Sequence, residues 1–128
     1  MKKIMFVCLG NICRSPIAEA VFAHLVSEKG LAKKYYADSS GTSAFHVGAD
    51  PDPRMAVTAE KKGIMMDHKA QQFEKSHFDK FDIIFAMDKS NYDDIISMTQ
   101  NGKLRKKVYL LRQFDSEATS NQASVPDP

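Results

Sequence analysis

Five residues separate Cys8 from Arg14 in the stretch FVCLGNICRSPIAEA, residues 6–20. A thiol that lies beside a guanidinium and at the first turn of a helix is in positive surroundings, which favour its thiolate form. A thiolate is a strong nucleophile. The planar guanidinium matches two oxygens of a phosphate group. These residue types predict attack of sulfur on phosphorus, with a cysteinyl-phosphate as the covalent intermediate. This chemistry needs neither a metal ion nor a cofactor, and we expect neither.

The residues between the thiol and the guanidinium suit a loop that binds an anion through backbone amides. Gly10 allows close approach of the backbone, and Asn11 tolerates a left-handed conformation. Ser15 is a plausible helix N-cap, and Pro16 fits the first helical turn. Because the first amides of a helix have no intrahelical partners, they attract an anion. We therefore expect a phosphate-binding loop made of Leu9, Gly10, Asn11, Ile12, Cys13 and Ser15.

An inert role for Cys8 is the alternative, since a cysteine at a strand end is usually a small buried residue. Cysteine and arginine at this spacing are weak evidence when they stand alone. Here an apolar run directly precedes the loop and an amphipathic segment directly follows it, as a strand and a helix that position such a loop would. This context favours the reactive thiol.

Apolar runs alternate with amphipathic segments along the chain. We expect strands over residues 3–8, 34–40, 81–87 and 106–114, and helices over residues 16–29, 53–62 and 88–98. Gly30 and Gly63 are placed to end the first two helices, and Asp52 and Asp88 to cap the last two. The alternation predicts a mainly parallel sheet with helices on both faces. Ligands bind at the carboxyl ends of such strands, where the loop after Cys8 lies.

The composition is that of a soluble globular domain. The chain has 128 residues, of which 43% are hydrophobic and 27% charged, and its net charge is +2. The weak charge argues against a nucleic-acid partner, and no apolar stretch is long enough to span a membrane. The basic cluster at 103–107 is interpreted as a solvated loop. The short apolar run at the N-terminus is interpreted as a first strand, and we expect a cytoplasmic protein.

The sequence resembles the low-molecular-weight protein tyrosine phosphatases in several motifs. These are VCLGNICRSP at 7–16, DSSGTSAFHVGADPDPRM at 38–55, DHKAQQ at 67–72, FDIIFAMDKSN at 81–91 and VPDP at 125–128. The resemblance implies a flavodoxin-like fold with a four-stranded parallel sheet. It also implies that Cys8 is the nucleophile and Arg14 the phosphate clamp. Asn11, Ser15, Ser39 and His68 would then form the network that holds the loop.

A general acid is needed for the leaving group, and the sequence offers Asp50, Asp52, Asp88 and Asp127. Asp52 and Asp88 already have an interpretation as helix caps, and in the family the Asp-Pro of the last loop supplies the acid. The resemblance therefore assigns this role to Asp127. Family members continue beyond this point with aromatic residues and a C-terminal helix. We expect residues 1–128 to form a single phosphatase domain without that helix.

The pocket walls are expected to include Ile12, Phe45 and His46, although Phe45 could belong to the core. An apolar β-branched side chain at Ile12 favours an aromatic ring over a guanidinium. The resemblance also implies that Cys13 is a redox partner of Cys8, since many members carry this pair. The alternative is that Cys13 only packs under the loop.

These features predict hydrolysis of phosphotyrosine in proteins and of small aryl phosphates. Inorganic phosphate, sulfate and vanadate are the expected inhibitors. The alternatives are a catalytically weak phosphotyrosine-binding module, an arginine phosphatase and an arsenate reductase of the same fold. The reductase would need a further cysteine after Cys13, and the chain has two cysteines in all. A phosphocarrier domain is disfavoured by Arg14 and Ser15.

Overall fold

The structure is a computed structural model that describes residues 1–11, 14–43, 46–64, 66 and 68–111. Its strands are β1 (Lys2–Cys8), β2 (Tyr35–Gly41), β3 (Ile83–Ala86) and β4 (Val108–Leu110). Its helices are α1 (Arg14–Glu28), α2 (Pro53–Lys61), α3 (Ser76–Lys80), α4 (Lys89–Ser97) and α5 (Gly102–Arg105). The strands form one parallel sheet in the order β2-β1-β3-β4. This confirms the parallel sheet that the sequence pattern predicts and the four-stranded flavodoxin-like fold that the family resemblance implies.

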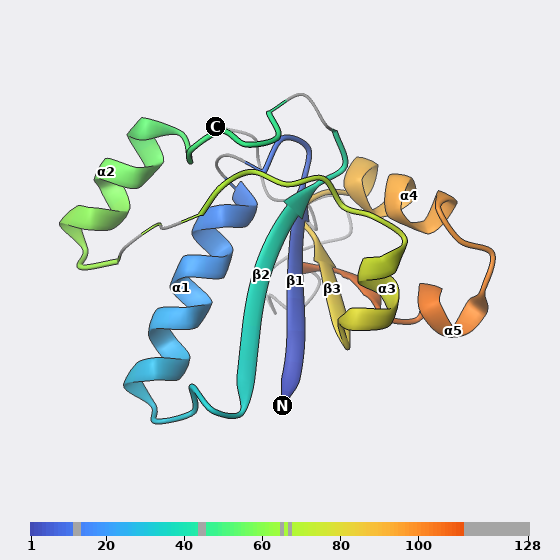
Figure 1. The fold of residues 1–128 in the computed structure, drawn as a ribbon, viewed down its shortest axis with the longest axis horizontal. Helices are drawn as coiled ribbons and strands as arrows, with labels where there is room; N and C mark the ends of the chain where they lie inside the picture. The colour runs from blue at the N-terminus through green and yellow to red at the C-terminus, as the bar shows by residue number, and fades with distance from the viewer. Residues whose placement is uncertain (12–13, 44–45, 65, 67, 112–128) are drawn as a thin grey trace.

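Successive side chains of β1 point to opposite faces of the sheet, and each face has its own core. Met5 and Val7 pack with Phe78 of α3 and Ile95 of α4 on one face. The side chains of β1 on the other face pack against α1, where the ring of Phe22 contacts them. Burial of each such side chain contributes roughly 1.5–3 kcal/mol. Helices therefore cover both faces of the sheet (Figure 1).

Most helices begin and end at the capping residues and glycines that the sequence predicts. Gly30, with a φ of 71°, follows the end of α1, and Asp52 caps α2 by accepting a hydrogen bond from the Arg54 amide. Asp88 caps α4 by accepting from the Asn91 amide. The prediction that Ser15 is an N-cap is wrong. Helix α1 begins at Arg14, so Ser15 lies inside its first turn and its hydroxyl is used elsewhere.

The second half of the chain departs further from the sequence prediction. Strand β4 begins only at Val108, because residues 106 and 107 turn out of helix α5. Helices α3 and α5 were not expected, and α5 occupies part of the basic stretch interpreted as a loop. Both are single short turns that lack the length needed for a clear periodic pattern. Within the described part of the chain, no helix is both long and apolar enough to cross a membrane.

The carboxyl ends of β1, β2 and β3 meet at one edge of the sheet. Beyond the ladders, Thr42 donates its amide hydrogen to the carbonyl of Cys8, at 2.9 Å. Met87 donates to the carbonyl of Val7, also at 2.9 Å. The end of β1, from which the loop starts, is thus bonded to the residues that follow both neighbouring strands.

Candidate active site

Cys8 is the last residue of β1, and its side chain is buried, with 1% of its surface exposed. Two hydrogen-bonding groups converge on its sulfur. The Asn11 amide donates to Sγ at 3.2 Å, and the Ser15 hydroxyl lies 3.0 Å from it. Both come from the loop and the first turn of α1, which curl back over the strand end. A negative charge on the sulfur is therefore met by hydrogen-bond donors and by the positive end of the helix dipole.

Asn11 adopts a left-handed backbone conformation, with a φ of 57°, and its side chain is buried. This conformation turns its amide toward Cys8. The side-chain nitrogen donates to Ser15 Oγ at 2.8 Å, and Oδ1 accepts from the Gln71 amide at 2.9 Å. Oδ1 also lies 2.6 Å from His68 Nε2. Because a backbone amide can only donate, these contacts assign the orientation of the Asn11 side chain.

Ser15 connects the sulfur to the rest of the network. It accepts a hydrogen bond from Asn11 and lies 3.3 Å from the carbonyl oxygen of Ser40, to which it can donate. A serine has a single hydroxyl hydrogen, so Ser15 can donate to only one of Ser40 and Cys8 at a time. When the sulfur carries a charge, donation to sulfur is the stronger choice.

Gly41 ends β2 directly beside the loop. A Cβ atom at this position would lie 2.6 Å from the Leu9 carbonyl oxygen and 3.1 Å from the Asn11 amide nitrogen. Both neighbours are backbone atoms and cannot rotate away. The absence of a side chain at Gly41 is therefore a condition for the loop conformation.

Arg14 is the first residue of α1, and 6% of its side chain is exposed. Its Nη1 donates to Asp88 Oδ2 at 2.8 Å. The other oxygen of Asp88 accepts from the Asn91 amide at 2.7 Å and so caps α4. One carboxylate therefore positions both the guanidinium and the helix that follows β3.

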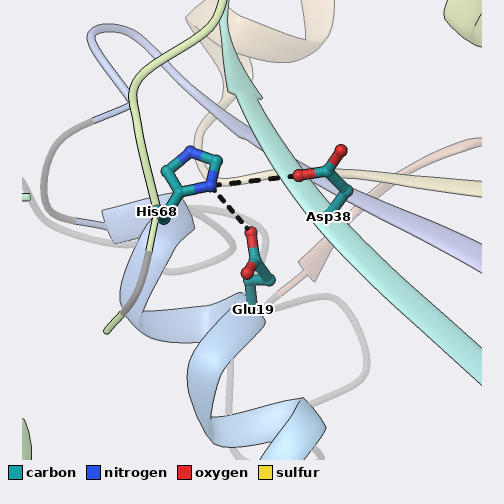
Figure 2. Close-up of side chains that lie close together, drawn as sticks. All are labelled: Glu19, Asp38 and His68. Carbon is teal, nitrogen blue, oxygen red and sulfur yellow. Dashed lines mark ion pairs between the residues drawn. The ribbon is translucent and has the colours of Figure 1, made fainter. Parts of the chain in front are cut away.

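Ser39 and His68 lie behind the loop, where Figure 2 shows His68 facing Glu19 and Asp38. The Ser39 hydroxyl donates to Glu19 Oε1 at 2.8 Å and lies 3.2 Å from His68 Nε2. Burial raises the pKa of Glu19 to about 7. Burial also lowers the pKa of His68, an effect that the charge of Asp38 opposes. The structure thus brings Cys8, Asn11, Ser15, Ser39 and His68 into one connected network.

Of the remaining predicted site residues, the structure describes some and not others. Leu9 stands at the rim with 52% of its surface exposed, and His46 is half-buried in a turn. That turn is held to the segment after His68 by paired backbone hydrogen bonds, from Gly48 to Ala70 and from Ala70 to Ala49. The other predicted residues, Ile12, Cys13, Phe45 and Asp127, lie outside the described residues.

Sequence reasoning missed the parts of the network that come from distant segments. These are Glu19, Asp38 and Gln71, together with the second contact of Asp88. Glu19 follows Ser15 by one helical turn, so its side chain projects to the same face of α1. Asp38 directly precedes Ser39. Neither the helical spacing of Glu19 nor the position of Asp38 along its strand indicates that the two carboxylates meet at His68, which lies on another segment.

The arrangement can bind a tetrahedral oxyanion at a helix N-terminus above a buried thiol. In the sequence comparison, residues 3–128 match the family described as low molecular weight phosphotyrosine protein phosphatase. A low molecular weight phosphotyrosine protein phosphatase of Schizosaccharomyces pombe is 46% identical over 127 residues, which cover 98% of this chain and 80% of the relative.

Solved structures agree with this comparison. A protein tyrosine phosphatase from Entamoeba histolytica, crystallised with Hepes in the active site, superposes with a TM-score of 0.92 at 37% identity. The match covers 100% of this chain and 80% of that chain. A Drosophila arginine phosphatase superposes with a TM-score of 0.77 at 35% identity, over 84% of this chain and 69% of that one.

Proposed function

This chain belongs to the low molecular weight phosphotyrosine protein phosphatase family and hydrolyses protein phosphotyrosine, and we propose that it does so through a phosphocysteine formed on Cys8. The observation that carries this proposal is the convergence of the Asn11 amide and the Ser15 hydroxyl on the buried sulfur. An inert core cysteine would be expected to have apolar neighbours at these places.

The first step transfers the phosphoryl group to the protein. The thiolate of Cys8 attacks phosphorus, the S–P bond forms and the bond from phosphorus to the phenolic oxygen breaks. Asp127 gives its proton to the leaving phenolate. Arg14 and the loop amides bind the equatorial oxygens, whose charge is stabilised in the transition state.

The second step returns the protein to its starting state. A water molecule attacks phosphorus while the carboxylate of Asp127 accepts its proton. The S–P bond breaks, inorganic phosphate leaves and the sulfur departs as a thiolate. The Ser15 hydroxyl, 3.0 Å from Sγ, donates to this leaving thiolate.

The substrate preference follows from the residues around the loop opening. The exposed Leu9 and the apolar residue type at Ile12 favour an aromatic ring, and we propose Phe45 and His46 as further pocket residues. We propose phosphotyrosine proteins and small aryl phosphates as substrates, and phosphate, sulfate and vanadate as inhibitors. A phosphoarginine substrate is the alternative that the assay must include. A cytoplasmic location, where thiols stay reduced, suits this chemistry.

The test is hydrolysis of p-nitrophenyl phosphate and of a phosphotyrosine peptide in the presence of EDTA. We expect sustained turnover by the wild type and none above background by Cys8→Ser. Isothermal titration should show that the variant still binds inorganic phosphate. Near-normal activity of Cys8→Ser would reject the proposed intermediate. A single burst without turnover would indicate a binding module, and faster hydrolysis of phosphoarginine would overturn the substrate preference.

A further inference from the structure

A cavity of about 390 Å³ lies beside α3, toward the end of the sheet at which β1 and β2 begin. Its wall includes Tyr36 of β2, His77 of α3 and Phe81, which directly follows α3. The ring centroid of Phe81 lies 6.3 Å from that of Tyr36 and 5.9 Å from that of His77. Rings from two parts of the chain therefore form one aromatic wall.

Tyr36 is the accessible part of this wall. It is 46% exposed, whereas His77 and Phe81 are 9% and 6% exposed. Aromatic pairs prefer ring centroids about 4.5–7 Å apart, so a flat ring that enters the cavity can stack on Tyr36. Such stacking removes apolar surface from water, which favours binding. The cavity is large enough for a bicyclic ring, since ligand pockets commonly measure about 300–1,000 Å³.

His77 contributes a hydrogen-bond donor to the wall. Its Nδ1 accepts from the Glu74 amide at 2.9 Å, and a backbone amide can only donate. Burial lowers the pKa of His77, so at about pH 7 the ring is neutral and carries its hydrogen on Nε2. Among the residues that the structure describes, the contact with Glu74 is the only hydrogen bond of this ring. The Nε2 donor therefore favours a ligand that brings an acceptor into the cavity.

Two ammonium groups flank the cavity. Lys3 of β1 and Lys80 of α3 line it, and neither side chain forms an ion pair within the described part of the chain. The carboxylate of Asp38 also lines the cavity. One of its oxygens accepts from Gln71 Nε2 at 3.0 Å and the other from the Ser39 amide at 2.8 Å. Because the ammonium groups outnumber this carboxylate, the cavity favours a singly charged anion over a cation or a phosphate dianion.

We propose that this cavity binds a small, flat aromatic carboxylate. The ring of the ligand stacks on Tyr36, and its carboxylate accepts from His77 Nε2 and from the ammonium groups of Lys3 and Lys80. Hydrogen bonds that join a charged donor to a charged acceptor are among the stronger ones in proteins. The cavity wall contains no residue of the phosphate-binding loop, so this ligand can bind while the loop holds an oxyanion.

The test is an NMR titration of the full chain with 2-naphthoate. Orthovanadate is added first to occupy the phosphate-binding loop, so that the carboxylate cannot bind there. We expect saturable shifts of the ring signals of Tyr36 and Phe81 and of the Nε2–H group of His77, with one ligand per chain. Neutral 2-naphthamide has the same rings without the charge, and it should bind at least tenfold more weakly.

Two double variants test the ammonium groups. Lys3→Gln/Lys80→Gln should weaken binding of 2-naphthoate at least tenfold. The matched control is Lys2→Gln/Lys33→Gln, which removes the same charge at exposed positions outside the cavity wall. Its affinity for 2-naphthoate should stay within twofold of the wild type. All four lysines are exposed, so we expect both double variants to fold.

Three results would overturn the proposal. The first is the lack of saturable shifts at Tyr36 and His77, including the case in which only signals of the phosphate-binding loop move. The second is an equal loss of affinity in the two double variants, which would reduce the effect to net charge. The third is equal binding of 2-naphthamide and 2-naphthoate. None of these results bears on turnover through Cys8, which the EDTA assay tests separately.

Discussion

Arg14 and Asp88 lie 74 positions apart in the sequence, and their side chains meet at 2.8 Å from Nη1 to Oδ2. Both are sheltered from solvent, with 6% and 25% of their side chains exposed. The same carboxylate caps α4 through its other oxygen. The guanidinium that we propose as the phosphate clamp is therefore held in place by the residue that follows β3 and caps α4.

The first prediction concerns this pair. Asp88→Asn keeps an oxygen that can cap α4 but removes the charge that orients Arg14. We expect a loss of roughly 10- to 100-fold in kcat/KM, because small misplacements at a reacting centre have effects of this size. The melting temperature should change little. Asp82→Asn is the matched control, since Asp82 also accepts from a backbone amide, that of Lys3, at the opposite end of the sheet. Equal kinetic losses in both variants would contradict the assignment.

The second prediction concerns the general acid. Asp127→Asn should slow hydrolysis of phenyl phosphate roughly 10²–10⁴-fold, the range for loss of a positioned proton donor. An ester of a very acidic phenol should lose much less, because its leaving group needs no proton. Steady-state rates on the two substrates measure the difference. Asp93→Asn, an exposed substitution on α4, serves as the control. Equal losses on both substrates would reject Asp127 as the acid.

The third prediction concerns Cys13. Peroxide oxidises a thiolate to a sulfenic acid, which a neighbouring thiol traps as a disulfide with release of water. A disulfide needs Cα atoms within roughly 7 Å, a separation that two cysteines in one curled loop can reach. After peroxide and then dithiothreitol, the wild type should regain most of its activity and Cys13→Ser far less. Peptide mass spectrometry should find Cys8 linked to Cys13. Equal recovery in both proteins would mean that Cys13 only packs.

The fourth prediction concerns stability in acid. His77 Nδ1 accepts a hydrogen bond from the Glu74 amide at 2.9 Å, and the ring packs against Phe73 and Phe81. Burial lowers the pKa of His77 below its usual 6.5. The charges of Glu74 and Asp38 oppose this shift of the pKa, and the charge of Lys80 adds to it. The unfolded chain therefore takes up this proton first as the pH falls. The contribution of His77 to stability is complete above about pH 6.5 and declines below it.

Urea unfolding at pH 7.5 and pH 5.5 measures this contribution. His77→Gln keeps an acceptor for the Glu74 amide but cannot take up the proton. The free energy of unfolding of the wild type should therefore fall more on acidification than that of His77→Gln. His24→Gln, at a half-exposed position, should behave like the wild type. Parallel pH profiles for the wild type and His77→Gln would contradict the prediction.

The sequence alone was enough for the features that depend on neighbours along the chain. The apolar run before Cys8, the spacing to Arg14 and the helical period after Pro16 are local, so they predicted β1, the loop and α1 in the right order. The alternation of strands and helices predicted the parallel sheet. Asp52 and Asp88 were correctly predicted as caps, because a cap bonds to an amide two or three residues away.

Only the tertiary structure decided how the site is held. Asn11 meets His68 across 57 positions and Gln71 across 60, and no local pattern encodes such pairs. The same holds for the meeting of Glu19, Asp38 and His68. The prediction for Ser15 failed for this reason. A serine before a proline suits a cap, but the sulfur of Cys8 and the carbonyl of Ser40, brought close by the pairing of β1 with β2, offer its hydroxyl buried partners instead.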